Sequence, residues 1–197
     1  MIHDRASGAA FAGAHGGDRP VIFLDLEGAI IETRPGRTDP VYSLRPGADE
    51  GLRRLAQTSD LLVALVEPPP PDASRRDRTL DLLDGIRAPM LRGGPQLLFV
   101  GCPHRPFQTC HCRHPGIGLI EQAIDRYGID THGGWHISGE QEGVQAGRSA
   151  GLRTVRIGPP SEDHLTAVHR ADYEARDLLD AANWILVQSL TGTLESA

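Results

Sequence analysis

The sequence predicts an α/β domain in which a parallel sheet carries helices on both faces. Short apolar runs alternate along the chain with segments of helical periodicity, the pattern of strand–helix–strand units. The first apolar run, residues 21–24, stops abruptly at Asp25, as expected of a buried parallel strand that ends at a ligand-binding edge. The length of 197 residues suits a single domain with a sizeable core.

The elements follow from apolar spacing and from the positions of glycine and proline. Gly28 allows a turn after the first strand, and the prolines and glycine of residues 32–45 exclude a long helix there, so a flap over the strand end is expected. Further strands are expected at residues 61–66, 97–100, 135–138, 154–157 and 171–175. Helices are expected at residues 48–57, 76–85, 116–127, 143–150 and 177–190, and a stiff proline loop at 67–71.

Composition narrows the class of partner and the location. The formal net charge is −6 and no basic run occurs, which disfavours nucleic acid. No apolar stretch has the length of a membrane span and no secretory signal is present, so a cytoplasmic protein is expected. Residues 1–18, rich in glycine and alanine, are predicted to be a disordered tail, residues 19–190 a single domain and residues 191–197 a frayed terminus.

All the cysteines lie close together in one segment, which argues against a disulfide framework. With one histidine they form the pattern C-x-H-x5-C-x-C, made by Cys102, His104, Cys110 and Cys112. Three sulfurs and one imidazole are the ligand set of a closed structural zinc site. The alternative is three free thiols beside a chance histidine.

Two carboxylates follow the first strand at a spacing that lets both point into one site. Asp25 and Glu27 could serve as a nucleophile and a proton donor. A solvated loop is the alternative explanation of the same pattern.

Five segments together resemble the haloacid dehalogenase superfamily, in the branch of D-glycero-D-manno-heptose 1,7-bisphosphate and histidinol-phosphate phosphatases. They are F-L-D-L-E-G-A-I (23–30), Y-S-L-R-P-G-A (42–48), C-P-H with C-H-C-R-H-P (102–115), S-G-E-Q-E-G-V-Q-A-G-R-S-A-G (138–151) and D-L-L-D-A-A-N-W-I-L (177–186). The resemblance covers about residues 20–187. It implies a Rossmann-like fold with the flap as a minimal cap.

The resemblance also implies roles for single residues. Asp25 would attack phosphorus and Glu27 would protonate the leaving group. Arg113 and His114 would grip the phosphate. A magnesium ion, weakly bound, would be held by Asp25, Glu27 and Glu140.

Several positions depart from the family pattern. Val66 replaces a hydroxyl residue that binds phosphate, and His114 replaces a lysine. Glu140 replaces an aspartate, and Gly143 falls where a second acid is expected. Because loss of one preorganised donor typically lowers a rate ~10²–10³-fold, these changes predict a slow or specialised enzyme.

Three functions are therefore compatible with the sequence. The first is a phosphatase of carbohydrate metabolism that acts on a sugar phosphate of the heptose bisphosphate type through Asp25. The second is an inactive pseudo-phosphatase that binds a ligand or a protein partner. The third is a magnesium-independent hydrolase, or a dehalogenase-like enzyme, that uses Asp25.

Overall fold

The computed structural model describes residues 19–34, 36, 41–66, 96–104, 108–159 and 170–195. The predicted tail at 1–18, proline loop at 67–71 and helix at 76–85 lie outside these residues. No helix within the described ranges is both long and apolar enough to cross a membrane.

A parallel sheet of six strands forms the centre of the molecule, and each neighbouring pair in it runs in the same direction. Its order is β5 (Gln96–Gly101), β4 (Leu61–Val66), β1 (Ile22–Asp25), β6 (Trp135–Ser138), β7 (Arg153–Ile157) and β8 (Tyr173–Ala175). The first strand of the sequence is thus central, and every residue of β1 is buried.

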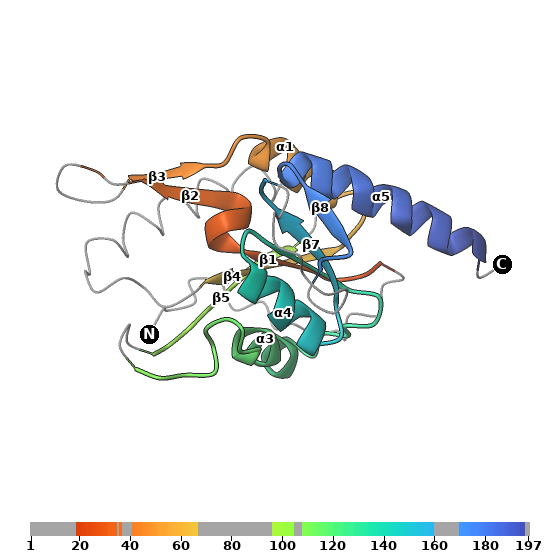
Figure 1. Ribbon diagram of the computed structural model, residues 1–197. Helices are drawn as coiled ribbons and strands as arrows, with labels where there is room; N and C mark the ends of the chain where they lie inside the picture. Colours follow the sequence, from red (N-terminus) through yellow and green to blue (C-terminus); the bar gives the residue numbers. More distant parts are fainter. Residues whose placement is uncertain are drawn as a thin grey trace.

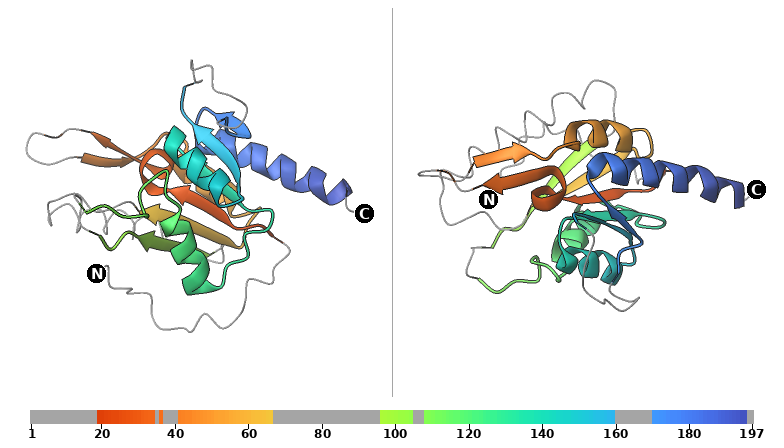
Figure 2. Two further views of the ribbon diagram at one scale, coloured as in Figure 1. Left: turned by 60° about the horizontal axis from the view of Figure 1, so that its bottom comes forward. Right: turned by 45° about the horizontal axis from the view of Figure 1, so that its top comes forward.

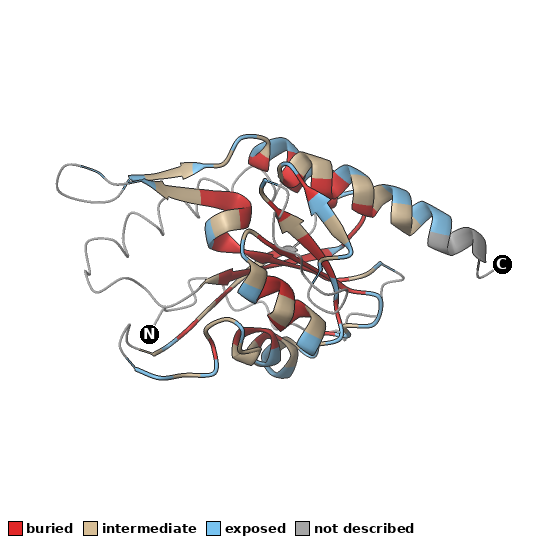
Figure 3. Ribbon diagram, viewed as in Figure 1, coloured by how far each residue is buried: buried red, intermediate tan, exposed pale blue. Residues whose placement is uncertain are grey.

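Helices cover both faces of this sheet, which confirms the predicted fold class (Figures 1 and 2). α1 (Ala48–Leu55) and α5 (Leu178–Glu195) pack together on one face, over a core that includes Ile22, Leu24, Leu52, Trp135 and Ile185. α3 (Gly118–Tyr127) and α4 (Gln141–Ser149) lie on the other, where Phe23, Val63, Leu119 and Ile120 are buried. Figure 3 shows the buried residues along β1 and on the sheet-facing sides of the helices.

The alternation of side chains along β1 places its last residue on a particular face. Ile22 and Leu24 point toward α1 and α5, whereas Phe23 and therefore Asp25 point toward α3 and α4. On β6 the same alternation buries Trp135 and Ile137 on the first face and directs His136 and Ser138 to the second. Two adjacent strands thus direct polar side chains to one face at the edge where both end.

The segment after β1 turns sharply and then forms the flap. In the irregular turn η1 (Leu26–Ile30), Gly28 has a φ of 92°, a conformation that favours glycine. β2 (Ile31–Arg34) and β3 (Val41–Leu44) pair antiparallel in a hairpin that projects from the body (Figure 1). The predicted flap is therefore an ordered pair of strands where described.

Several helix boundaries differ from the sequence prediction by one or two residues, among them the end of α1 and the start of α3. α4 begins at Gln141, ahead of the expected residue 143, because Gly143 is an interior residue of this helix rather than its start. α5 continues to Glu195, past the expected end at residue 190. Its last turns extend beyond the sheet (Figure 1).

Candidate functional site

The site lies at the carboxyl edge of the sheet, where β1 and β6 end beside each other. Asp25 is the last residue of β1, and His136 lies in the buried strand β6. A third side chain, His114, comes from the loop between β5 and α3. In α/β proteins this edge is where ligands bind, because helix N-termini and loops converge there.

Asp25 is enclosed by two imidazole rings. Its Oδ1 lies 2.9 Å from His136 Nε2 and 3.4 Å from His114 Nε2. The exposed fractions of the side chains are 9% for Asp25, 8% for His114 and 0% for His136. The carboxylate is therefore almost shielded from water and is satisfied by side chains instead.

The hydrogen bond to Asp25 fixes the tautomer of His136. His136 Nδ1 is buried and has no hydrogen-bond partner among the described residues. It faces the backbone of Gly147, where an added Cβ would lie 2.7 Å from this nitrogen. A proton on Nδ1 would be unpaired, so neutral His136 carries its proton on Nε2 and donates it to Asp25.

Asp25 is ionised in this environment. Burial raises its pKa, but electrostatic interaction and hydrogen bonding with His136, electrostatic interaction with His114 and the nearby Ser138 hydroxyl outweigh that effect. The net result is a pKa below the ordinary value for aspartate. An ionised carboxylate at a strand end is a competent nucleophile or metal ligand.

The helix α4 approaches this cluster through two glycines spaced four residues apart. A Cβ at Gly143 would overlap Ser138 Oγ and would lie 2.7 Å from Asp25 Oδ2, closer than real contacts of a Cβ. A Cβ at Gly147 would press on the ring of His136 in the same way. The position that matches the second acid of the family therefore has no room for a side chain.

The two other acids named from the sequence lie apart from this cluster. Glu27 and Glu140 are both exposed. The Glu140 N–H donates to Ser138 Oγ, and this hydroxyl donates to the Glu140 carbonyl oxygen. Among the described residues, the metal-compatible group around Asp25 contains His114 and His136 and neither of these glutamates.

His136 was not identified from the sequence, although a signal for it exists. In the strand W-H-I-S the polar residues His136 and Ser138 alternate with Trp135 and Ile137. Period-two alternation in a strand covered on both faces means that polar side chains point into a buried layer, where they require partners. The nearest strand end that could supply one is Asp25.

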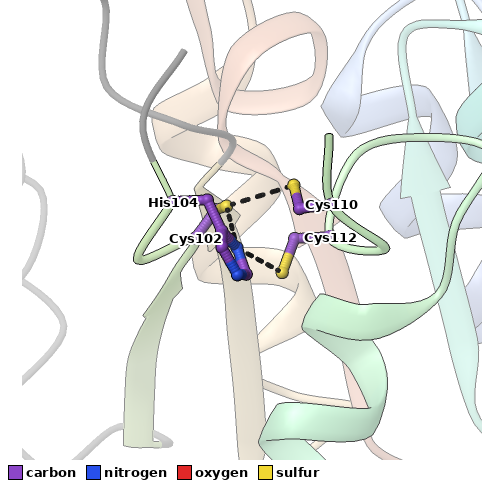
Figure 4. Close-up of side chains that lie close together, drawn as sticks. All are labelled: Cys102, His104, Cys110 and Cys112. Atoms are coloured by element: carbon purple, nitrogen blue, oxygen red, sulfur yellow. Dashed lines mark hydrogen bonds between the residues drawn. The ribbon is translucent and has the colours of Figure 1, made fainter. Parts of the chain in front are cut away.

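The predicted zinc ligands converge in the loop after β5 (Figure 4). Cys102 Sγ lies 3.4 Å from His104 Nδ1 and 3.7 Å from Cys110 Sγ, and Cys112 Sγ lies 3.6 Å from His104 Nδ1. Ligands on a tetrahedral zinc are separated by about 3.8 Å between sulfurs and about 3.6 Å between sulfur and nitrogen. The spacing of these atoms thus fits one zinc ion.

The thiols of this loop are held in contrasting environments. Burial and the neighbouring thiols of Cys102 and Cys110 raise the pKa of Cys112 to about 12. Burial also raises the pKa of Cys110, but hydrogen bonds with the Cys112 backbone, Cys102 and Arg113 have a larger effect in the opposite direction. The net result is a pKa of Cys110 below its ordinary value. A bound cation would stabilise all three thiolates together.

The same loop positions the residues predicted to hold phosphate. The Gly116 N–H donates to the Arg113 carbonyl oxygen at 2.7 Å, and the Gly118 N–H donates to the His111 carbonyl oxygen at 2.9 Å. These hydrogen bonds form a tight turn, and the turn positions His114 beside Asp25. Arg113 is half-buried on this turn, with its guanidinium close enough to Cys110 to lower the pKa of that thiol. Val66 ends β4 without a hydroxyl, as noted from the sequence.

Comparison with known proteins finds partial sequence similarity to curated phosphatases and a shared fold among solved structures. No family model matches the chain. A D-glycero-beta-D-manno-heptose-1,7-bisphosphate 7-phosphatase of Pseudomonas aeruginosa is 33% identical over 66 residues, which are 34% of this chain and 37% of the relative. A probable D-glycero-D-manno-heptose-1,7-bisphosphate 7-phosphatase of Thermoplasma acidophilum is 45% identical over 53 residues, 26% of this chain and 32% of the relative. The chain thus matches about a third of the length of these two curated relatives.

Solved structures share the fold over nearly the whole chain. The D,D-heptose 1.7-bisphosphate phosphatase of B. bronchiseptica, complexed with magnesium and phosphate, superposes with a TM-score of 0.66 at 22% identity, covering 86% of this chain and 99% of that one. A 3-deoxy-D-manno-octulosonate 8-phosphate phosphatase of Moraxella catarrhalis has a TM-score of 0.54 at 13% identity, covering 90% and 92%. The chain has the haloacid dehalogenase fold, and part of its sequence is similar to curated heptose-1,7-bisphosphate phosphatases.

Proposed function

We propose that the protein is a phosphatase that hydrolyses a phosphate monoester of a sugar, of the heptose bisphosphate type. The observation that carries this proposal is the carboxylate of Asp25, ionised at the carboxyl end of the central strand. Similarity to heptose-bisphosphate phosphatases supports the substrate class.

In the proposed reaction an oxygen of Asp25 attacks phosphorus and the sugar hydroxyl leaves. Glu27, two residues further on and exposed in η1, donates a proton to the leaving oxygen. The aspartyl-phosphate is then hydrolysed by a water that Glu27 deprotonates, which returns the carboxylate and releases phosphate. His114, beside Asp25, and Arg113 on the same turn hold the phosphoryl oxygens.

The residues around Asp25 do not fit a magnesium ion. Magnesium prefers oxygen ligands in octahedral geometry, whereas Asp25 Oδ1 contacts two imidazole nitrogens. A Cβ at Gly143 would lie 2.7 Å from the other carboxylate oxygen, so position 143 cannot carry an acid there, and Glu140 is exposed. The weak magnesium site proposed from Asp25, Glu27 and Glu140 thus lacks a supporting arrangement, and no catalytic step is assigned to it.

The loop of Cys102, His104, Cys110 and Cys112 is proposed to hold a structural zinc ion. Its ligand spacing supports this, and the ion would supply folding free energy to a segment with little core of its own. Because His114 is two residues beyond Cys112, the metal would also hold that side chain beside Asp25.

A pseudo-phosphatase is the second candidate, and the enclosure of Asp25 favours it. With 9% of its side chain exposed and two imidazoles against Oδ1, Asp25 is poorly placed to meet a substrate unless His114 moves. Such a protein would bind a sugar phosphate or a partner protein without turnover. A magnesium-independent hydrolase using Asp25 is the third candidate.

Phosphate release from a panel of sugar phosphates that includes heptose 1,7-bisphosphate tests the proposal. The wild type is compared with Asp25→Asn, with and without added divalent metal. Asp125→Asn is the matched control, because Asp125 is exposed on α3. We expect release by the wild type and the control and a fall to background in Asp25→Asn. Absence of release from every substrate by the wild type would favour the pseudo-phosphatase.

A further inference from the structure

We infer that Asp25, His114 and His136 form a binding site for a divalent transition metal ion of the zinc or iron class. The three side chains come from the end of β1, from β6 and from the loop before α3. Their ligand atoms, one oxygen and two nitrogens, all lie within 4.8 Å of one another. Its ligands are distinct from the four residues of the zinc loop, although His114 lies on the same loop, and the site does not depend on the protein being a phosphatase.

The distances match the edges of a coordination sphere. With metal–ligand bonds of about 2.0–2.1 Å, ligand atoms are about 3.4 Å apart on a tetrahedral ion and about 2.9 Å apart at right angles. Asp25 Oδ1 lies 3.4 Å from His114 Nε2 and 2.9 Å from His136 Nε2. A metal can thus take the place of the protons between these atoms with little movement of the side chains.

The chemistry of the ligands selects the class of metal. Imidazole suits zinc, iron, copper and nickel, whereas magnesium prefers carboxylate, carbonyl and water oxygens. One carboxylate and two neutral imidazoles leave a divalent ion with a single net positive charge. The near-complete burial of all three side chains also leaves little space for the several waters that magnesium retains.

The surroundings hold the ligands in position. His136 and Asp25 lie on adjacent paired strands, and the backbone of Glu140 holds the neighbouring Ser138 hydroxyl in place. The glycines of α4, Gly143 and Gly147, let the helix backbone close over Asp25 and His136. Rigid strand positions and close packing are the support that a metal site needs.

The Nδ1 atom of His136 limits the affinity of this site for a metal ion. To bind a metal through Nε2, neutral His136 must move its proton to Nδ1, which has no hydrogen-bond partner among the described residues. An unpaired buried N–H of this kind weakens binding by about 10- to 100-fold. We therefore expect this site to bind metal more weakly than the loop of three cysteines.

Cobalt titration of the purified full-length chain tests the inference without any substrate. Co²⁺ bound by thiolates gives an intense charge-transfer absorption, whereas Co²⁺ bound by imidazole and carboxylate gives visible ligand-field bands without it. We expect about two Co²⁺ per chain, with the charge-transfer absorption saturating first and the second ion adding visible bands only.

Variants assign the second ion to its ligands. His114→Gln should lower the stoichiometry to about one and remove the second set of bands, with the charge-transfer absorption intact. His132→Gln, at an exposed histidine, is the matched control and should retain both ions. His136→Gln should give the same result as His114→Gln. If His136→Gln fails to fold, the stoichiometry of the wild type and of His114→Gln still tests whether the second ion binds at this site. Only one Co²⁺ in the wild type, two in His114→Gln, or displacement of the second ion by millimolar Mg²⁺ would overturn the inference.

Discussion

Gly143 gives a direct test of how tightly α4 is packed on Asp25. A Cβ at this position would overlap Ser138 Oγ and lie 2.7 Å from Asp25 Oδ2, so Gly143→Ala forces either the helix or Ser138 to move. If Ser138 rotates away, its hydrogen bonds with the backbone of Glu140 are lost. The substitution therefore strains the site even though alanine is the better helix former.

The expected change in the free energy of unfolding combines two destabilising contributions and one stabilising contribution. Overpacking a close-packed core typically costs ~1–3 kcal/mol, and loss of the two hydrogen bonds of Ser138 adds ~2 kcal/mol. The higher helix propensity of alanine offsets ~1 kcal/mol of this cost. We expect Gly143→Ala to lower the free energy of unfolding by ~2–4 kcal/mol.

Urea unfolding in saturating zinc measures this change, with Ser149→Ala, at an exposed residue of the same helix, as the control. The control should stay within ~0.5 kcal/mol of the wild type. Ser138→Ala should cost less in the Gly143→Ala background than in the wild type, because it removes one of the overlapping atoms. A Gly143→Ala variant as stable as the wild type, or strict additivity with Ser138→Ala, would refute the packing described here.

Two further predictions concern the zinc loop and the response to acid. Cys110→Ser should reduce bound zinc by about one ion per chain and lower the melting temperature, because the metal supplies folding free energy. Metal analysis and calorimetry measure these two effects. A wild type that holds no zinc and whose thiols all titrate freely would contradict the prediction. Hydrogen bonds from the side chain and backbone of Arg176 hold the pKa of Asp180 below its ordinary value. The resulting stabilisation is present above the unfolded-state pKa, at about pH 3.9, and is lost as the pH falls through the folded-state pKa. The stability difference between the wild type and Asp180→Asn should therefore shrink in acid, and a constant difference would disprove the linkage.

Much of the sheet could be predicted because its strands are buried on both faces. The expected strands at 61–66 and 135–138 coincide with β4 and β6, since each is a short run bounded by turn or acidic residues. The hairpin strands β2 and β3 were not predicted as strands. Their side chains are mostly half-buried or exposed, so no apolar alternation marks them in the sequence.

The candidate site was predictable in part for a related reason. Asp25 and His114 follow from local segments that resemble a family, and the structure brings them together. His136 lies more than a hundred residues beyond Asp25, and only the parallel pairing of β1 with β6 makes them neighbours. Spacing along the chain does not reveal that β1 pairs with β6. The sequence therefore predicts Glu27 and Glu140, rather than His136, as partners of Asp25.

The departures from the family pattern are physically connected at one carboxylate. Gly143 stands where the resemblance implies an acid, and it lets α4 pack against Asp25. His114 stands where the resemblance implies a lysine, so an imidazole takes the place of a permanently charged ammonium, and His136 adds a second imidazole 2.9 Å from Asp25 Oδ1. A lysine at position 114 would repel a cation bound to Asp25, whereas two imidazoles can share it. In the proposed metal site these differences together give nitrogen ligands where the resemblance implies oxygen ligands, and all of them act on the same carboxylate rather than at unrelated places.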